Sequence, residues 1–152
     1  MLENDRKRVL VYGMTDNPGG IETYLMNLIK EMPIIKFDFV TDFPKMAYEK
    51  ELKEYGAEIY YIPAKSRGLL AQWKEFWKIL KQHQEYHVIY FNILNAGAMF
   101  TMVVPWILRR KIVIHSHNGS ADNIRFHNVC RPFMNFMGSQ FVACSKLAGQ
   151  FM

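Results

Sequence analysis

The chain of 152 residues is half hydrophobic and 22% charged, which excludes a disordered tail, a collagen-like repeat and a disulfide-stapled mini-protein. Its length suits one domain spanning residues 1–152 and is too short for two domains of ordinary size. The formal net charge of +5 is uneven, because residues 1–60 hold 8 Lys/Arg against 11 Asp/Glu whereas residues 61–152 hold 11 against 3. Such a basic half attracts phosphates, nucleic acids or anionic lipids without selecting among them, and a solvated basic face has the same composition.

Strand-like and helix-like segments alternate along the whole chain. The segments with strand patterns are 8–13, 36–41, 57–62, 87–92, 111–116 and 140–144. The segments with helical patterns are 21–32, 46–55, 69–83, 95–108 and part of 121–137, with a break near Pro132, and a last helix follows Ser145. This alternation is typical of βαβ units, so it predicts an α/β fold: a Rossmann-like three-layer α/β/α sandwich with a mostly parallel sheet in the order 3-2-1-4-5-6.

One uncharged stretch, residues 89–108, is nearly long enough to span a bilayer. It contains Asn95 and Pro105 and divides into a strand and a helix, so we interpret it as a buried strand–loop–helix unit. The two cysteines, Cys130 and Cys144, match no CxxC or zinc pattern and fit a reducing compartment. With no cleavable signal near the first residues, the sequence indicates a cytoplasmic protein. Cys144 is expected to be buried in the sixth strand.

The polar segments that follow the predicted strands are the candidate ligand-binding loops. In an open parallel sheet, ligands bind outside the carboxyl ends of the strands, where 13–20, 92–95, 115–120 and Ser145 would converge. The first loop lacks both GxGxxG and the Walker Gly-Lys-Ser/Thr, which disfavours a nicotinamide-dependent oxidoreductase. Gly19-Gly20 nevertheless opens a helix, where free N–H groups and absent Cβ atoms suit a phosphate, although an ordinary helix-entry turn has the same sequence.

Glu22, His115 and His117 are the candidate chemical groups near these loops. Glu22 lies in the first turn of its helix, where a carboxylate either stabilises the helix dipole or faces the cleft to receive sugar hydroxyls. His115 and His117 share one face of the fifth strand, and His117 lies further into the loop, where it could donate to a substrate oxygen or transfer a proton. An HxH pair can also bind a metal, but no third ligand stands at a suitable spacing, so no metal is expected. Ser145 lacks a nucleophile elbow and is expected to cap the last helix.

Four motifs in order resemble family 4 glycosyltransferases, in particular bacterial members that build capsular polysaccharide and exopolysaccharide. Pro18–Leu25 looks like the PGG-x-E segment that opens the first helix of the family. Asp38–Val40 and Tyr55–Ile59 follow as in those members. Ile112–Asn118 is similar to the family's strand with a terminal histidine, and Phe141–Lys146 to the strand-plus-serine after it.

The resemblance implies a GT-B enzyme, in which two Rossmann-like domains face each other across a cleft. The N-terminal domain of such enzymes mainly binds the acceptor and the C-terminal domain the nucleotide sugar, and transfer retains the anomeric configuration without a metal or another cofactor. By the match, Gly19 and Gly20 lie against the donor diphosphate with Glu22 nearby. His117 matches the family histidine that faces the reacting sugar, which makes it the candidate catalytic residue.

The acceptor is assigned to Asn92, Asn95, Asn118 and Ser145 by their place after the strands. Asn92 departs from the family, because many members have histidine at this position. The basic pair and the glutamate pair of the family's C-terminal half are also absent. We therefore expect the acceptor-side half of a longer hexosyltransferase, with the C-terminal nucleotide-sugar-binding domain outside this chain and no activity in the isolated half.

The helix 69–83 carries a separate hypothesis. A lysine-rich face opposite aromatic residues suits a helix that lies on the inner face of the membrane, although an outer helix packed on the sheet has the same pattern. The residues concerned are Leu69, Trp73, Lys74, Trp77, Lys78 and Lys81. A glycan or lipid-linked acceptor would fit this placement. The alternative to an enzyme is a non-enzymatic Rossmann-like binding module, and no motif supports a nucleic-acid partner.

Overall fold

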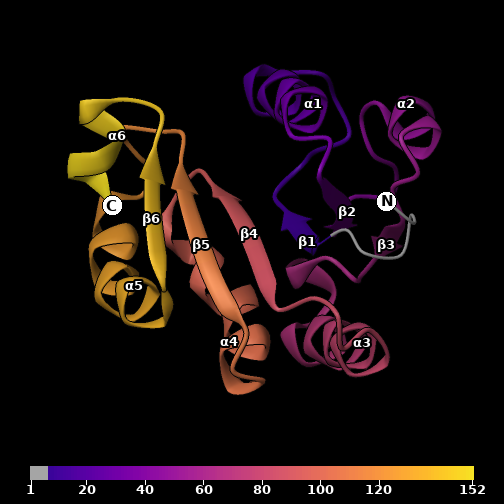
Figure 1. Cartoon of the computed structure of the whole chain (residues 1–152). Coiled ribbons are helices and arrows are strands. Elements are labelled where there is room, and N and C mark those ends of the chain that lie inside the picture. Colours follow the sequence, from indigo (N-terminus) through magenta and orange to yellow (C-terminus); the bar gives the residue numbers. More distant parts are fainter. Residues whose placement is uncertain (1–6) are drawn as a thin grey trace.

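The computed structural model describes residues 7–152, which form one six-stranded sheet with helices on both faces (Figure 1). Every pair of neighbouring strands is parallel, and the order β3-β2-β1-β4-β5-β6 confirms the predicted topology. The strands are β1 (Lys7–Tyr12), β2 (Ile35–Thr41), β3 (Ile59–Tyr61), β4 (Val88–Ile93), β5 (Lys111–Ser116) and β6 (Gln140–Ala143). The chain therefore has a Rossmann-like three-layer α/β/α architecture with an all-parallel sheet.

Helices connect consecutive strands, as right-handed crossovers between parallel strands require. They are α1 (Gly20–Glu31), α2 (Glu49–Glu54), α3 (Leu69–Gln82), α4 (Met99–Ile107), α5 (Ile124–Met137) and α6 (Lys146–Phe151), with two 3-10 turns, η2 (Lys65–Arg67) and η3 (Ala96–Ala98). The uncharged stretch 89–108 divides into β4, η3 and α4 as expected. Within residues 7–152 no helix has the length and apolarity needed to cross a membrane.

Side-chain alternation along the strands builds two hydrophobic clusters, one on each face of the sheet. On one face, Leu10, Ile89 and Ile112 pack with side chains of α3, α4 and α5. On the other face, Val11 and Phe39 belong to the cluster that includes side chains of α1 and α2. Both faces of β1 are thus buried, so β1 is a central strand of the sheet. It lies next to β4, at the point where the strand order reverses.

Two helices differ from the sequence pattern. The expected break near Pro132 is wrong, because α5 continues through this residue to Met137. Proline costs one backbone hydrogen bond, but His127, Cys130 and Met134 bury the inner face of the helix on both sides of it and hold the axis together. The helix expected over 46–55 is shorter, because Tyr48 has a left-handed φ of 54° and α2 begins only after it.

Candidate functional site

A cleft of about 810 Å³ opens at the carboxyl ends of the strands, between the first turns of α1 and the ends of β5 and β6. It is lined by Thr15, Gly20, Ile21, Glu22, Tyr24, Leu94, His115, His117, Asn118, Val142, Ala143 and Cys144. On one side of the cleft, α1 follows its N-cap residue Gly19, and no side chain caps the helix N-terminus. A Cβ atom at Gly20 would meet nothing within 4 Å, so the helix N-terminus is open to a ligand from this side.

Glu22 is a buried carboxylate that is bound to the first loop. Its Oε1 accepts hydrogen bonds from the backbone N–H of Thr15 at 2.8 Å and from the Thr15 hydroxyl at 2.9 Å. A Cβ atom at Gly19 would lie 2.9 Å from Oε2, so a glycine there lets the chain pass close to the carboxylate. The position in the first turn also suits a negative charge, because the helix dipole is positive at that end. Glu22 therefore holds the loop against α1 and leaves Oε2 as its second acceptor.

His115 and His117 share one face of β5 and its extension, as strand alternation predicted. Their ring centroids lie 4.0 Å apart, and Tyr24 of α1 presents its ring to both, at 4.9 and 5.7 Å. The Tyr90 hydroxyl lies 2.7 Å from His115 Nδ1 and 3.1 Å from the Tyr24 hydroxyl. These contacts join α1, β4 and β5 into a rigid wall of the cleft.

His117 is positioned by Asn92 of β4. Its Nε2 lies 2.9 Å from Asn92 Oδ1, and Asn92 Nδ2 donates to the carbonyl oxygen of Tyr12 at 3.3 Å. The His117 backbone N–H donates to the Ile93 carbonyl, and the Cys144 thiol donates to the His117 carbonyl. The histidine is thus held by the strands on either side of β5.

Burial keeps both imidazoles neutral. Burial, together with the charge that His117 would carry, lowers the pKa of His115 to about 4. Burial also lowers the pKa of His117, while the nearby Glu22 carboxylate acts in the opposite direction. At neutral pH each ring therefore offers one N–H donor and one lone pair.

A second cleft of about 460 Å³ lies on the other side of the first loop. Asn92 and Asn95 line it together with Tyr12, Asp42 and Lys65 among others, and it shares Thr15 and Leu94 with the first cleft. Asn95 is exposed, but its Oδ1 accepts from the Gly97 N–H and caps η3. Asn92 is only 4% exposed, and its amide group is hydrogen-bonded to Tyr12 and His117.

The structure divides the predicted site residues between these clefts. Gly20, Glu22, His117 and Asn118 line the first cleft, Asn92 and Asn95 line the second, and Gly19 borders Glu22. Ser145 lines neither cleft, and its Oγ accepts from the Ala148 N–H as the expected cap of α6.

Sequence reasoning missed four contributors to this region, Thr15, Tyr24, Tyr90 and Cys144. Tyr24 and Tyr90 fit the apolar periodicity of α1 and β4, so only their hydroxyl groups could have signalled a polar role. Thr15 lies in the loop that the pattern did select. The expectation that Cys144 is buried is wrong, because β6 ends at Ala143 and leaves Cys144 exposed at the edge of the cleft.

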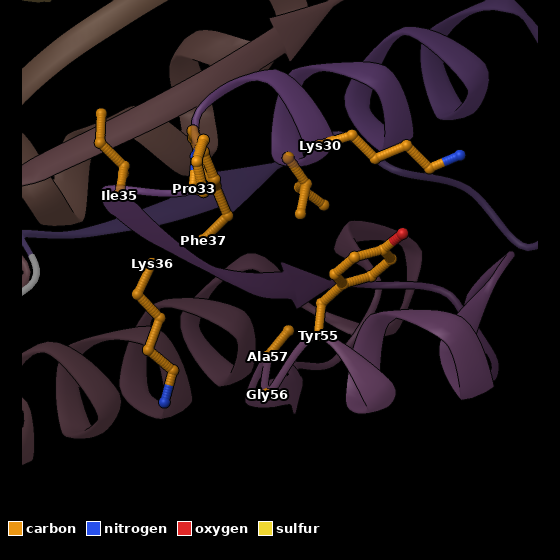
Figure 2. A pocket seen from close by; sticks show the side chains of 9 residues that line it. Lys30, Pro33, Ile35, Lys36, Phe37, Tyr55, Gly56 and Ala57 are labelled. Carbon is orange, nitrogen blue, oxygen red and sulfur yellow. The ribbon is translucent and has the colours of Figure 1, made fainter. Parts of the chain in front are cut away.

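Another hollow lies at the opposite edge of the sheet and has a different character. It measures about 160 Å³ and lies between the end of α1, the start of β2 and the residues after α2. Pro33, Phe37 and Tyr55 form much of its wall, whereas the amines of Lys30 and Lys36 point away from one another (Figure 2). No polar groups converge there as they do around His117. Within the described residues, no three His, Cys, Asp or Glu side chains are grouped closely enough to share a metal ion.

Comparison with known proteins gives one sequence relative and several structural ones. No protein-family model matches the chain. The sequence is 35% identical over 66 residues to the Bacillus subtilis (strain 168) protein named "Putative glycosyltransferase EpsF", a match that covers 41% of this chain and 17% of that protein.

The structural relatives show the fold. The Anabaena protein Alr3699/HepE, solved in complex with UDP-glucose, superposes with a TM-score of 0.69 at 21% identity, covering 95% of this chain and 39% of that one. A UDP-N-acetylglucosamine 2-epimerase superposes with a TM-score of 0.65 at 10% identity, covering 96% and 44%. The chain thus spans about two fifths of the length of these structures, and its fold is the glycosyltransferase-like Rossmann fold that GT-B enzymes share with UDP-sugar epimerases.

Proposed function

We propose that the chain is the acceptor-side half of a retaining glycosyltransferase of family 4. The whole enzyme would move a sugar of the hexose type from a nucleotide sugar to a glycan or lipid-linked acceptor, in the synthesis of capsular polysaccharide or exopolysaccharide. The observation that carries the proposal is the first cleft, where an open helix N-terminus, a buried carboxylate and a neutral histidine converge at the switch point of the sheet.

The donor side of the proposal rests on the start of α1. Gly19 and Gly20 would lie against the donor diphosphate, since nothing obstructs approach to the α1 N-terminus at Gly20. Glu22 would face the same region through Oε2, and His117 would contact the reacting sugar. The relative solved with UDP-glucose supports a sugar nucleotide as the ligand class. No metal or other cofactor is proposed.

The acceptor side rests on the second cleft, which meets the first at Thr15 and Leu94. Asn95 offers exposed amide groups there, and Asn118 lines the first cleft beside His117. Asn92 would act mainly by positioning His117, and Ser145 mainly by capping α6. A C-terminal domain would supply the remaining contacts to the nucleotide sugar, so the isolated half should be inactive.

The test is made on the intact native gene product, whose mass is measured first. We expect it to release UDP or GDP from a nucleotide sugar when acceptor is present, and we expect His117→Ala to lower turnover about a hundredfold. His87→Ala, an exposed histidine just before β4 at the opposite edge of the sheet, is the matched control. A native product that ends with this domain and releases no nucleotide from any sugar nucleotide would overturn the proposal and favour a non-enzymatic binding module.

We also propose a cytoplasmic enzyme that contacts the inner leaflet through α3. Trp73 does not belong to the proposed membrane-contacting surface, because it packs against the hydrophobic core and its indole N–H donates to the Phe100 carbonyl at 2.6 Å. Leu70 remains 77% exposed and Trp77 39% exposed, and the amine of Lys81 lies 5.6 Å from the Trp77 ring. Exposed apolar groups beside lysines are the pattern of an interfacial helix.

Vesicle sedimentation checks this contact. We expect binding to vesicles of phosphatidylglycerol that weakens with salt and with Trp77→Ala. Trp106→Ala removes a tryptophan of α4 that is 43% exposed and should have little effect. Equal binding by both variants would contradict a role for α3.

A further inference from the structure

The side-chain amide of Asn92 has only one orientation that satisfies its neighbours. A backbone carbonyl can only accept, so the Asn92 atom that lies 3.3 Å from the Tyr12 oxygen must be the donor Nδ2. Oδ1 is then the atom that lies 2.9 Å from His117 Nε2. Because Asn92 is 4% exposed and fixed between β1 and β4, water cannot readily replace either bond.

This orientation determines which nitrogen of His117 carries the proton. An amide oxygen only accepts, so the short contact requires a proton on Nε2 of His117. A neutral imidazole with a proton on Nε2 has a bare lone pair on Nδ1. Nδ1 has no hydrogen-bond partner among residues 7–152 and is not among their buried unpartnered polar atoms, so it is open to the cleft.

The charged and titratable groups around His117 keep this arrangement at neutral pH. The ring of His115 on β5 lies tilted against that of His117, with 4.0 Å between the centroids, and is itself neutral at this pH, whereas the Glu22 carboxylate on α1 favours protonation of His117. Tyr24 on α1 contacts the ring by its edge, and Cys144 after β6 bonds only the backbone of His117. Burial outweighs Glu22 and lowers the pKa of His117.

We propose that Asn92 is a positioning residue that holds His117 in the Nε2–H tautomer, so that Nδ1 accepts a hydrogen bond from a hydroxyl group of the bound sugar. The sugar as ligand rests on the proposed function, whereas the tautomer follows from the protein alone. A neutral His117 in this state selects a hydroxyl and disfavours a bare oxyanion, because it presents no N–H to the cleft from the ring.

NMR of the protein labelled with ¹⁵N at histidine tests the tautomer without any ligand. In the unsubstituted chain at neutral pH, we expect the Nε2 proton of His117 to be observed directly, protected from water, and Nδ1 to have the shift of a bare pyridine-like nitrogen. Asn92→Leu should abolish the protected proton signal and move the Nδ1 shift toward that of a tautomer mixture. Asn128→Leu, an exposed asparagine on α5, should change neither.

Asn92→Asp separates positioning from mere support of the fold. A carboxylate still accepts from Nε2 but adds a negative charge, so the pH midpoint for protonating His117 should rise by about one unit or more. A protonated Nδ1 in the neutral unsubstituted protein, or a midpoint unchanged in Asn92→Asp, would overturn the proposal. If Asn92→Leu fails to fold, these two measurements still decide. Neither depends on sugar transfer, so their outcome and that of the nucleotide-release assay are independent.

Discussion

His115 is 2% exposed and should make the stability of the chain depend on pH. Its pKa is about 4 in the folded chain and about 6.5 in an unfolded one, so the unfolded state binds more protons between these pH values. The free energy of unfolding should therefore fall as the pH drops below about 6.5, by about 2 kcal/mol at pH 5. Urea denaturation at pH 7 and pH 5 measures this loss.

His115→Gln removes one titrating group and should reduce the loss of stability between the two pH values, leaving the smaller part that His117 contributes because burial also lowers its pKa. His87→Gln, which changes an exposed histidine, should keep the full pH dependence of the native chain. A His115→Gln chain that loses as much stability as the native chain on acidification would show that other groups cause the loss.

Gly13 is the glycine with the least freedom to change. Its φ is +102°, and a Cβ atom would lie 2.1 Å from the carbonyl oxygen of Asn92. Gly13→Ala combines an unfavourable backbone conformation with a backbone clash, so we expect a loss of about 3 kcal/mol in the free energy of unfolding. Gly20→Ala is the control for stability, because its added methyl group meets open space. Similar denaturation midpoints for the two variants would contradict this account.

The sequence predicted which residues belong to the candidate site better than it predicted the hydrogen bonds between them. The rule that ligands bind after parallel strands selected His117 and Asn92 from the sequence, and Glu22 was selected by its place in the first turn of the helix after the glycine pair. The hydrogen bond that Thr15 donates to Glu22 and the one that His117 donates to Asn92 could not be predicted, because they join segments whose distance is set only when the fold is assembled.

At the scale of elements, His127 connects α5 to two other segments. Its Nδ1 accepts from the Ala96 N–H of η3 at 3.1 Å, and its Nε2 donates to the Phe151 carbonyl of α6 at 2.9 Å. His127→Leu keeps the bulk but leaves a buried backbone N–H without an acceptor, so we expect a loss of about 2 kcal/mol in stability, measured by thermal and urea unfolding. Asn128→Leu on the outer face of α5 serves as control, and equal stability of the two variants would exclude the bridge as a stabilising contact.

The helices and strands with a regular spacing of apolar residues were predicted well, whereas the residues at which they begin and end were predicted less well. Residues 111–116 coincide with β5, and α3 begins at Leu69 as the sequence indicated. The course of α5 through Pro132 could not be predicted, because it depends on how firmly the inner face of the helix packs on the sheet. Likewise, the late start of α2 could not be predicted, because Tyr48 takes a left-handed φ of 54° just before the helix and no residue pattern signals this conformation.

At the scale of the whole molecule, one outer face of α5 is strongly apolar. Phe126, Val129, Phe133 and Phe136 follow helical spacing and are 44%, 67%, 59% and 74% exposed. Because such a stripe in water favours association, we expect the isolated chain to self-associate as its concentration rises. Sedimentation velocity should show this, and Phe133→Lys with Phe136→Lys should shift the chain to the monomer.

The control for association is Phe43→Lys, which places the same charge on an exposed phenylalanine away from α5. Persistent association of the doubly substituted α5 chain would locate the contact elsewhere. The fold class and strand order were predictable at this scale because alternation of strands and helices determines them, whereas the exposure of this stripe was not, since it depends on what packs beside α5.

The shared wall between the two clefts makes them thermodynamically linked. Thr15 borders both, and its N–H and hydroxyl are both bonded to Glu22. A ligand that shifts Thr15 from one side must therefore change the free energy of binding on the other, and by reciprocity each ligand alters the affinity for its neighbour by the same factor. In the enzyme proposed above, donor and acceptor would change each other's affinity through this one loop.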